Sequence, residues 1–97
     1  MLYMEYNFLD IKTPKDIQME IVKNLRKKRK DMKITQEELA KKSGVSFGSI
    51  KRFENTGEIS LFSLTKIAIV LNCEDELTHL FKKREYSSIE EIINGKS

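Results

Sequence analysis

The spacing of apolar side chains along the chain predicts a series of short helices. Between residues 13 and 32, apolar positions recur every three or four residues, as they do on one face of a helix. These positions are Ile17, Ile21, Val22, Leu25 and Met32. Thr13 can cap this first helix, and Pro14 suits its first turn because a backbone amide there has no helical partner to lose.

A second and a third helix are predicted close together. Thr35 and Glu38 can form a capping box, and Gly44 can end the second helix because glycine accepts a positive φ. Ser46 can cap the third helix, and the run 55–57 ends it. The inner face of the third helix carries Ile50 and Phe53.

Two or three more helices are predicted toward the C-terminus. Ser60 can cap a fourth helix, and the acidic run 74–76 opens a fifth. The apolar stripe of the fourth comprises Leu61, Leu64, Ile67, Ala68 and Leu71, and that of the fifth comprises Leu77, Leu80 and Phe81. Ser87 can cap a short last helix, which carries Ile89, Ile92 and Ile93.

The first residues follow a different pattern. Met4, Tyr6 and Phe8 alternate with polar residues, which is typical of a strand or an extended arm. The sequence therefore predicts an all-α fold of five to six helices. Its predicted parts are an arm or strand over residues 1–12, one domain over 13–83, and a C-terminal helix over 84–97 that contacts a second copy or another partner.

Composition and charge add little to the predicted fold and leave the kind of partner open. Apolar residues are 39% and charged residues 34% of the 97, a globular composition that suits one domain. The net charge of +3 is small, but seven bases and a single acid lie between Lys23 and Lys33. This basic run indicates either an anionic partner or the solvated face of a helix, and charge alone leaves both open.

Residues with catalytic or metal-binding chemistry are scarce. Cys73 and His79 are the only cysteine and histidine, so we expect no disulfide, no zinc site and no nucleophile–base pair. The sequence has no glycine-rich phosphate loop, and we expect no cofactor and no enzymatic activity. It also has no apolar run of membrane-spanning length, and its start lacks the features of a signal peptide. We therefore expect a cytoplasmic protein.

The short connection between the second and third helices is the most informative feature. Only Ser43, Gly44 and Val45 separate them, so the two helices must cross steeply, and Ala40 supplies the small contact that a steep crossing needs. This is the arrangement of a helix-turn-helix, in which the first helix lies across the DNA backbone and the second enters the major groove.

The residues of this region resemble a known family. The run Thr35-Gln36-Glu37-Glu38-Leu39-Ala40-Lys41-Lys42-Ser43-Gly44-Val45-Ser46, followed by Ile50 and Phe53-Glu54-Asn55, is similar to the Cro/C1 (Xre-type) repressor family. The resemblance extends from about residue 21 to about residue 81. It implies a compact lambda-repressor-like domain that binds double-stranded DNA in a sequence-specific way. Phe47, Gly48 and Thr56 depart from the family pattern.

The resemblance also implies roles for individual residues. Gln36 and Asn55 would bind phosphates, while Arg29 and Glu54 would form a partly buried ion pair that could also aim Arg29 at the DNA backbone. The amides near Ser60 and Leu61 could hold another phosphate. The groove-facing positions of the third helix are Ser46, Phe47, Gly48, Lys51 and Arg52.

The chemistry of these side chains fits the implied roles. Arg52 lies about 200° around the helix from Ile50, so it points away from the core, and its planar fork matches guanine O6 and N7. Lys51 could reach guanine or phosphate, and Phe47 could contact a thymine methyl group. Arg52 binding only phosphate, Phe47 only packing and Ser46 acting only as a helix cap remain the alternatives.

Two expectations concern partners. Family members dimerise to read palindromic operators, and the apolar surplus of the last third suggests a homodimer, unless the last helix folds back on its own domain. The run 8–14, followed by Thr35-Gln36, resembles more weakly the opening of HipB-type antitoxins, which also neutralise a HipA-like kinase toxin. We therefore expect an autoregulating transcriptional repressor, with the antitoxin as the alternative.

Overall fold

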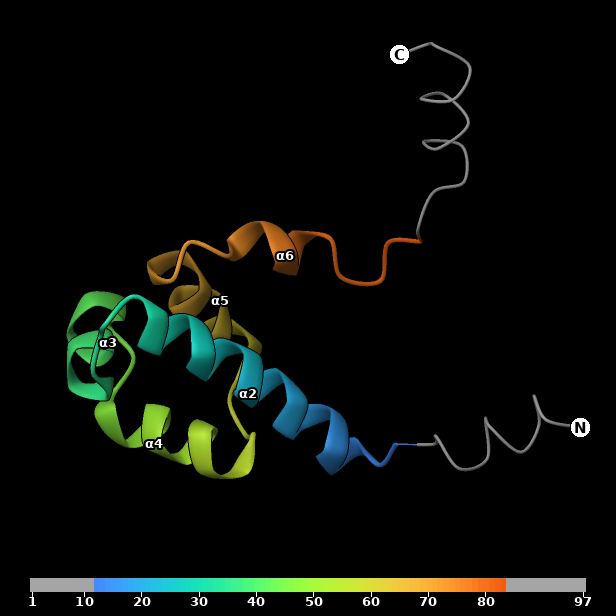
Figure 1. The fold of residues 1–97 in the computed structure, drawn as a ribbon, viewed down its shortest axis with the longest axis horizontal. Coiled ribbons are helices and arrows are strands. Elements are labelled where there is room, and N and C mark those ends of the chain that lie inside the picture. Colours follow the sequence, from blue (N-terminus) through green and yellow to red (C-terminus); the bar gives the residue numbers. More distant parts are fainter. Residues whose placement is uncertain (1–11, 84–97) are drawn as a thin grey trace, which may run out of the picture.

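The computed structural model describes residues 12–83, which form five α-helices without a strand in that range (Figure 1). The helices are α2 (Pro14–Asp31), α3 (Gln36–Ser43), α4 (Phe47–Thr56), α5 (Leu61–Val70) and α6 (Glu74–Thr78). The predicted N-terminal arm and the predicted last helix lie outside the described residues, apart from Lys12. The described part is all-helical, as the pattern predicts.

Side-chain caps fix where the helices begin. Thr13 and Thr35 each accept a hydrogen bond from the amide three residues on, and each belongs to a complete capping box. Ser46 and Ser60 cap α4 and α5 in the simpler way, through the hydroxyl alone. The predicted starts of these four helices are therefore confirmed.

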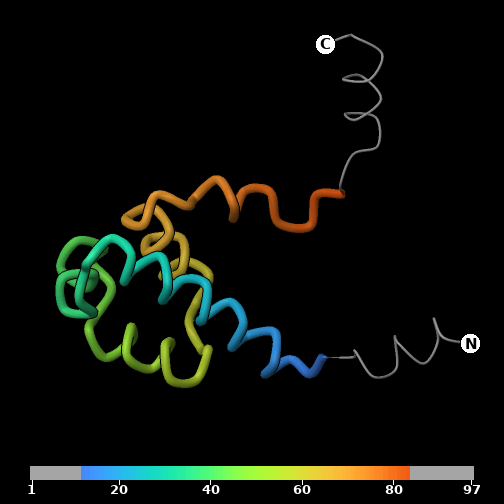
Figure 2. The backbone as a smooth tube through the Cα atoms, in the orientation of Figure 1, coloured from blue at the N-terminus to red at the C-terminus, as the bar shows by residue number. Residues whose placement is uncertain are grey.

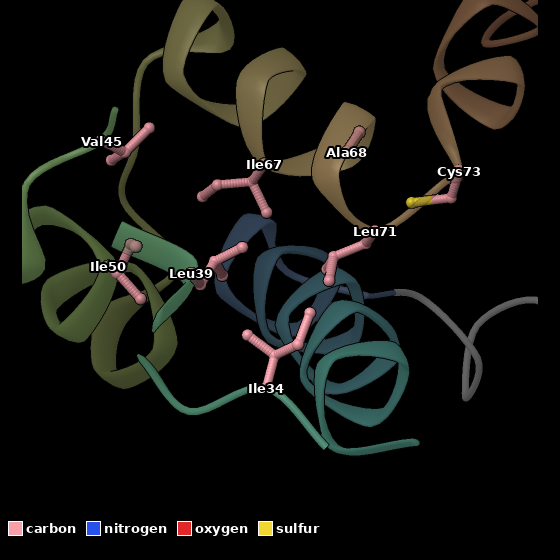
Figure 3. Close-up of a cluster of buried hydrophobic side chains, with 8 residues drawn as sticks. All are labelled: Ile34, Leu39, Val45, Ile50, Ile67, Ala68, Leu71 and Cys73. Carbon is pink, nitrogen blue, oxygen red and sulfur yellow. The ribbon is translucent and has the colours of Figure 1, made fainter. Parts of the chain in front are cut away.

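The core lies where α3, α4 and α5 meet the long helix α2. Figure 3 shows its central side chains: Leu39 of α3, Ile50 of α4, Ile67 and Ala68 of α5, and Ile34, Val45, Leu71 and Cys73 from the connecting segments. Of the ten buried apolar residues in the described part, six lie on helices and four in connections, so the short turns are held in place by burial as well as by hydrogen bonds. Cys73 packs here as a small apolar group.

Two predicted apolar stripes are buried only in part. Val22 is buried, but Ile17 and Ile21 are exposed, although Lys15 and Gln18 in the same turns contact Thr56 at the end of α4 and Gly57 after it. Leu61 is 67% exposed because the first turn of α5 extends past the core, which its later residues reach. These corrections leave apolar surface on the described part of the chain.

The fifth predicted helix is shorter than expected. Helix α6 ends at Thr78, before Leu80 and Phe81, and Phe81 has a φ of 66° with its side chain fully exposed. Figure 2 follows the backbone of this segment, drawn in orange, beyond α6. The side chains of Leu80 and Phe81 therefore do not complete the core.

Candidate nucleic-acid interface

Helix α3 ends at Gly44, as the sequence predicts. Gly44 has a φ of 78°, and its amide donates to the carbonyl of Ala40 at 2.9 Å, which ends α3. The Val45 side chain is buried, so the turn is anchored to the core. Three residues separate α3 from α4, and the two helices pack against each other.

A buried ion pair joins α2 to α4. The Arg29 Nε donates to Glu54 Oε2 at 2.8 Å, and its Nη2 donates to Oε1 at 2.9 Å. The Arg29 Nη1 donates to the carbonyl of Ile34 at 2.9 Å. Both charged residues are only 8% exposed, so the ion pair implied by the family resemblance is present. All three guanidinium nitrogens of Arg29 thus donate to groups within the domain, and Arg29 fixes α4 to α2.

Glu54 also binds the first residue of α3. The Gln36 Nε2 donates to Glu54 Oε1 at 2.8 Å, so one carboxylate connects α2, α3 and α4. Burial by itself raises the pKa of Glu54, but the hydrogen bonds from Arg29 and Gln36 and the charges of Arg29 and Arg26 outweigh it. The pKa therefore lies below its ordinary value, and the carboxylate is ionised at neutral pH.

The outer face of α4 is open to solvent. Phe47, Gly48, Lys51, Arg52 and Asn55 are all exposed on it. The Lys51 Nζ lies 5.2 Å from the centroid of the Phe47 ring, and a Cβ added to Gly48 would meet no atom within 4 Å. The Ser46 hydroxyl accepts a hydrogen bond from the Ser49 amide at 3.0 Å, so its expected role as a cap is confirmed. Most of the expected groove-facing side chains thus share one free surface.

Arg52 has a partner that the sequence analysis missed. Its Nη2 donates to Oε1 of Glu58, a residue in the connection between α4 and α5, and both side chains are exposed. The two residues are six apart and Glu58 lies beyond the helix, so no helical periodicity predicts the contact.

The basic run at the end of α2 is divided among several acids. Lys27 pairs with Asp31 at 3.1 Å, and Lys28 pairs with Glu76 of α6 at 3.3 Å. The Arg26 Nε lies 3.9 Å from Glu54 Oε1. Together with the burial of Arg29, these pairs mean that the run does not form one uniform basic patch.

Residues 12–83 contain neither a cluster of possible metal ligands nor a membrane-spanning helix. No group of three or more histidine, cysteine, aspartate or glutamate side chains there could hold a metal ion. No helix in the same range is long and apolar enough to cross a membrane.

Comparison with known proteins agrees with the geometry of the α3–α4 unit. A family described as Helix-turn-helix matches residues 25–77, which is more than half of the chain and extends from α2 into α6. No curated protein and no solved structure matches the chain. The matched region contains the α3–α4 turn, the Glu54 contacts and the open face of α4. The chain therefore belongs to the Cro/C1-type helix-turn-helix family of DNA-binding regulators.

Proposed function

We propose that the chain is a sequence-specific transcriptional repressor that binds a palindromic operator as a homodimer. The observation that carries this proposal is the open face of α4 beside the N-terminus of α3, with Glu54 fixing the two helices to α2. A helix fixed in this way can enter the major groove as one unit, and a repressor needs only to occupy its site.

The residues on this surface divide into two roles. Arg52 reads guanine. Lys51 makes a second polar contact to the base edges, and Phe47 makes an apolar contact to them. Gln36 and Asn55 bind phosphates near the C-terminal end of α4, where Gln36 contacts Glu54, the neighbour of Asn55. Gln36 donates one Nε2 hydrogen to Glu54 at 2.8 Å, which leaves its second Nε2 hydrogen for a phosphate.

A dimer follows from the reach of one recognition helix. One helix reads only a few base pairs, and two helices separated by about 34 Å read successive major grooves. Ile21, Leu77 and Leu80 line a largely apolar hollow of about 240 Å³ between α2, α5 and α6. Exposed apolar surface of this kind is typical of protein–protein interfaces, and we propose that a second copy of the chain binds here.

Selection from randomised duplex DNA tests the proposal. The native chain should enrich a site with approximate two-fold symmetry. Arg52→Ala should lose preference at one position of each half-site, because a bidentate arginine–guanine contact discriminates by about 1–3 kcal/mol. Its affinity for random duplex should largely remain, and Lys at this position should restore the preference only in part.

Three outcomes count against the proposal. A native chain that enriches no sequence contradicts sequence-specific binding. A selected site without two-fold symmetry contradicts the palindromic dimer. If Arg52→Ala weakens binding equally on every sequence, Arg52 is a phosphate contact.

An antitoxin remains the second candidate. It is favoured by further exposed apolar residues on α5, Phe62 and Ile69, which would suit a protein partner. In this function the chain represses its own operon and also neutralises a HipA-like kinase. Adding the purified chain to such a kinase should abolish phosphorylation by the kinase, and undiminished kinase activity at saturating chain contradicts this candidate.

A further inference from the structure

We infer that Glu58 is a positioning residue that sets DNA specificity by acting through Arg52. This inference rests on the proposed function. Glu58 accepts a hydrogen bond from the Arg52 Nη2 at the edge of the open α4 face. The hydrogen bond and charge of Arg52 hold the pKa of Glu58 below its ordinary value, so the pair is fully charged at neutral pH.

One hydroxyl group ties together the backbones of the two partners. The Thr56 Oγ1 donates to the carbonyl of Arg52 at 2.7 Å and accepts from the amide of Glu58 at 3.1 Å. With the Arg52–Glu58 contact, these bonds close a ring that includes both the backbones and the side chains of the pair. The position of the Glu58 carboxylate relative to α4 is therefore fixed by more than the ion pair.

Helix α2 also contacts the segment between Arg52 and Glu58. The Lys15 Nζ donates to the carbonyl of Thr56, and the Gln18 Nε2 donates to the carbonyl of Gly57 at 3.2 Å. Gly57 has a φ of 82° and lies so close to Gln18 that an added Cβ would be 2.8 Å from the Gln18 Cβ. Glu58 therefore follows a segment that is anchored to the domain.

This arrangement restricts what Arg52 can contact. A guanidinium has five N–H donors in one plane, and the contact with Glu58 occupies only one nitrogen, so donors remain for guanine O6 and N7. The carboxylate also repels phosphates, so it disfavours the orientations in which Arg52 would bind the DNA backbone. Glu58 thus lowers affinity for random DNA and raises preference for the base that Arg52 reads.

Glu58→Gln tests the inference because it keeps the side-chain shape and removes the charge. Affinity for random duplex should rise about three- to tenfold, and the salt slope should steepen by about one unit, because Arg52 becomes free to bind phosphate. Preference at the position read by Arg52 should fall about tenfold, which is part of the discrimination of a bidentate contact. The thermal unfolding midpoint should stay nearly unchanged, since both side chains are exposed.

Two controls separate positioning from a general change of charge. Glu74→Gln removes the same charge from α6 and should leave the base preference and the salt slope unchanged. In an Arg52→Ala background, Glu58→Gln should have no further effect on base preference, because Glu58 acts through Arg52.

The outcomes also distinguish this inference from the proposed function. If the native chain prefers one base clearly and Glu58→Gln keeps that preference, the role of Glu58 is wrong but the proposed function stands. The same result follows if Glu58→Gln changes the preference equally with and without Arg52. A native chain that shows no sequence preference overturns the proposed function and this inference together.

Discussion

Glu54 is the residue at which the three helices of the interface converge. Its carboxylate accepts hydrogen bonds from Arg29 of α2 and Gln36 of α3, and it is buried within α4. Removing one partner of a buried ion pair leaves the other charge uncompensated, which destabilises a domain much more than loss of an exposed pair does.

Glu54→Gln should therefore lower the free energy of unfolding by about 3 kcal/mol at neutral pH. The pKa of Glu54 is lower in the folded chain, so its stabilisation is fully present above about pH 4.5, the ordinary glutamate value, and is lost as the pH falls through the folded pKa. The difference between native chain and variant should shrink over that acid range. Urea unfolding at a series of pH values checks this, and a difference independent of pH contradicts it.

Gly48 offers a test of how closely α4 approaches DNA. Gly48→Ala should stabilise the free chain by about 0.5 kcal/mol, because alanine is the better helix former and a new Cβ meets no neighbour. Affinity for the selected duplex should fall about tenfold, since an extra methyl group in a packed contact costs about 1–3 kcal/mol. Thermal unfolding and fluorescence anisotropy measure the two effects, and unchanged affinity would mean that this part of α4 stays away from DNA.

Single-residue roles were predictable from the sequence only where the family pattern or helical geometry specified them. The Arg29–Glu54 pair followed from the family resemblance, and the exposure of Arg52 followed from its angle to Ile50. The contact between Arg52 and Glu58 depends on the path of a connection, which local patterns do not specify.

The ends of most helices were also predictable, because caps act within a few residues of the chain. Thr13, Thr35, Ser46 and Ser60 all bond amides three residues on, and these contacts are local. Burial was less predictable, because it depends on which face of a helix its neighbours cover. Ile17 and Leu61 fit apolar stripes and yet remain exposed for that reason.

The two glycines that end α3 and α4 allow a matched comparison. Gly44 and Gly57 have similar positive φ values of 78° and 82°, so alanine should strain either backbone by about 1–2 kcal/mol. Only at Gly57 would the new Cβ also clash, at 2.8 Å from the Gln18 Cβ. Gly57→Ala should thus destabilise the chain by about 1 kcal/mol more than Gly44→Ala. Chemical denaturation measures the free energy of unfolding of both variants. Equal decreases would mean that Gln18 of α2 moves away from the new Cβ without strain.

At the scale of the whole molecule, the exposed apolar residues favour formation of a homodimer. The native chain should sediment as a dimer at micromolar concentration, and Leu80→Ser should shift it toward monomer because Leu80 lines the hollow between α2, α5 and α6. Leu61→Ser removes a similarly exposed side chain from α5 and should leave the dimer intact. A native chain that stays monomeric with and without DNA contradicts the dimer.

The convergence of α2, α3 and α4 on one carboxylate has a thermodynamic consequence. A surface that folds as it binds loses conformational entropy and gives the large negative heat-capacity change of coupled folding. Here the three helices are already connected in the free chain through Glu54, so little of the described chain remains to be ordered. Calorimetric titrations at several temperatures should therefore give a heat-capacity change that the surface buried against DNA accounts for, without a contribution from folding.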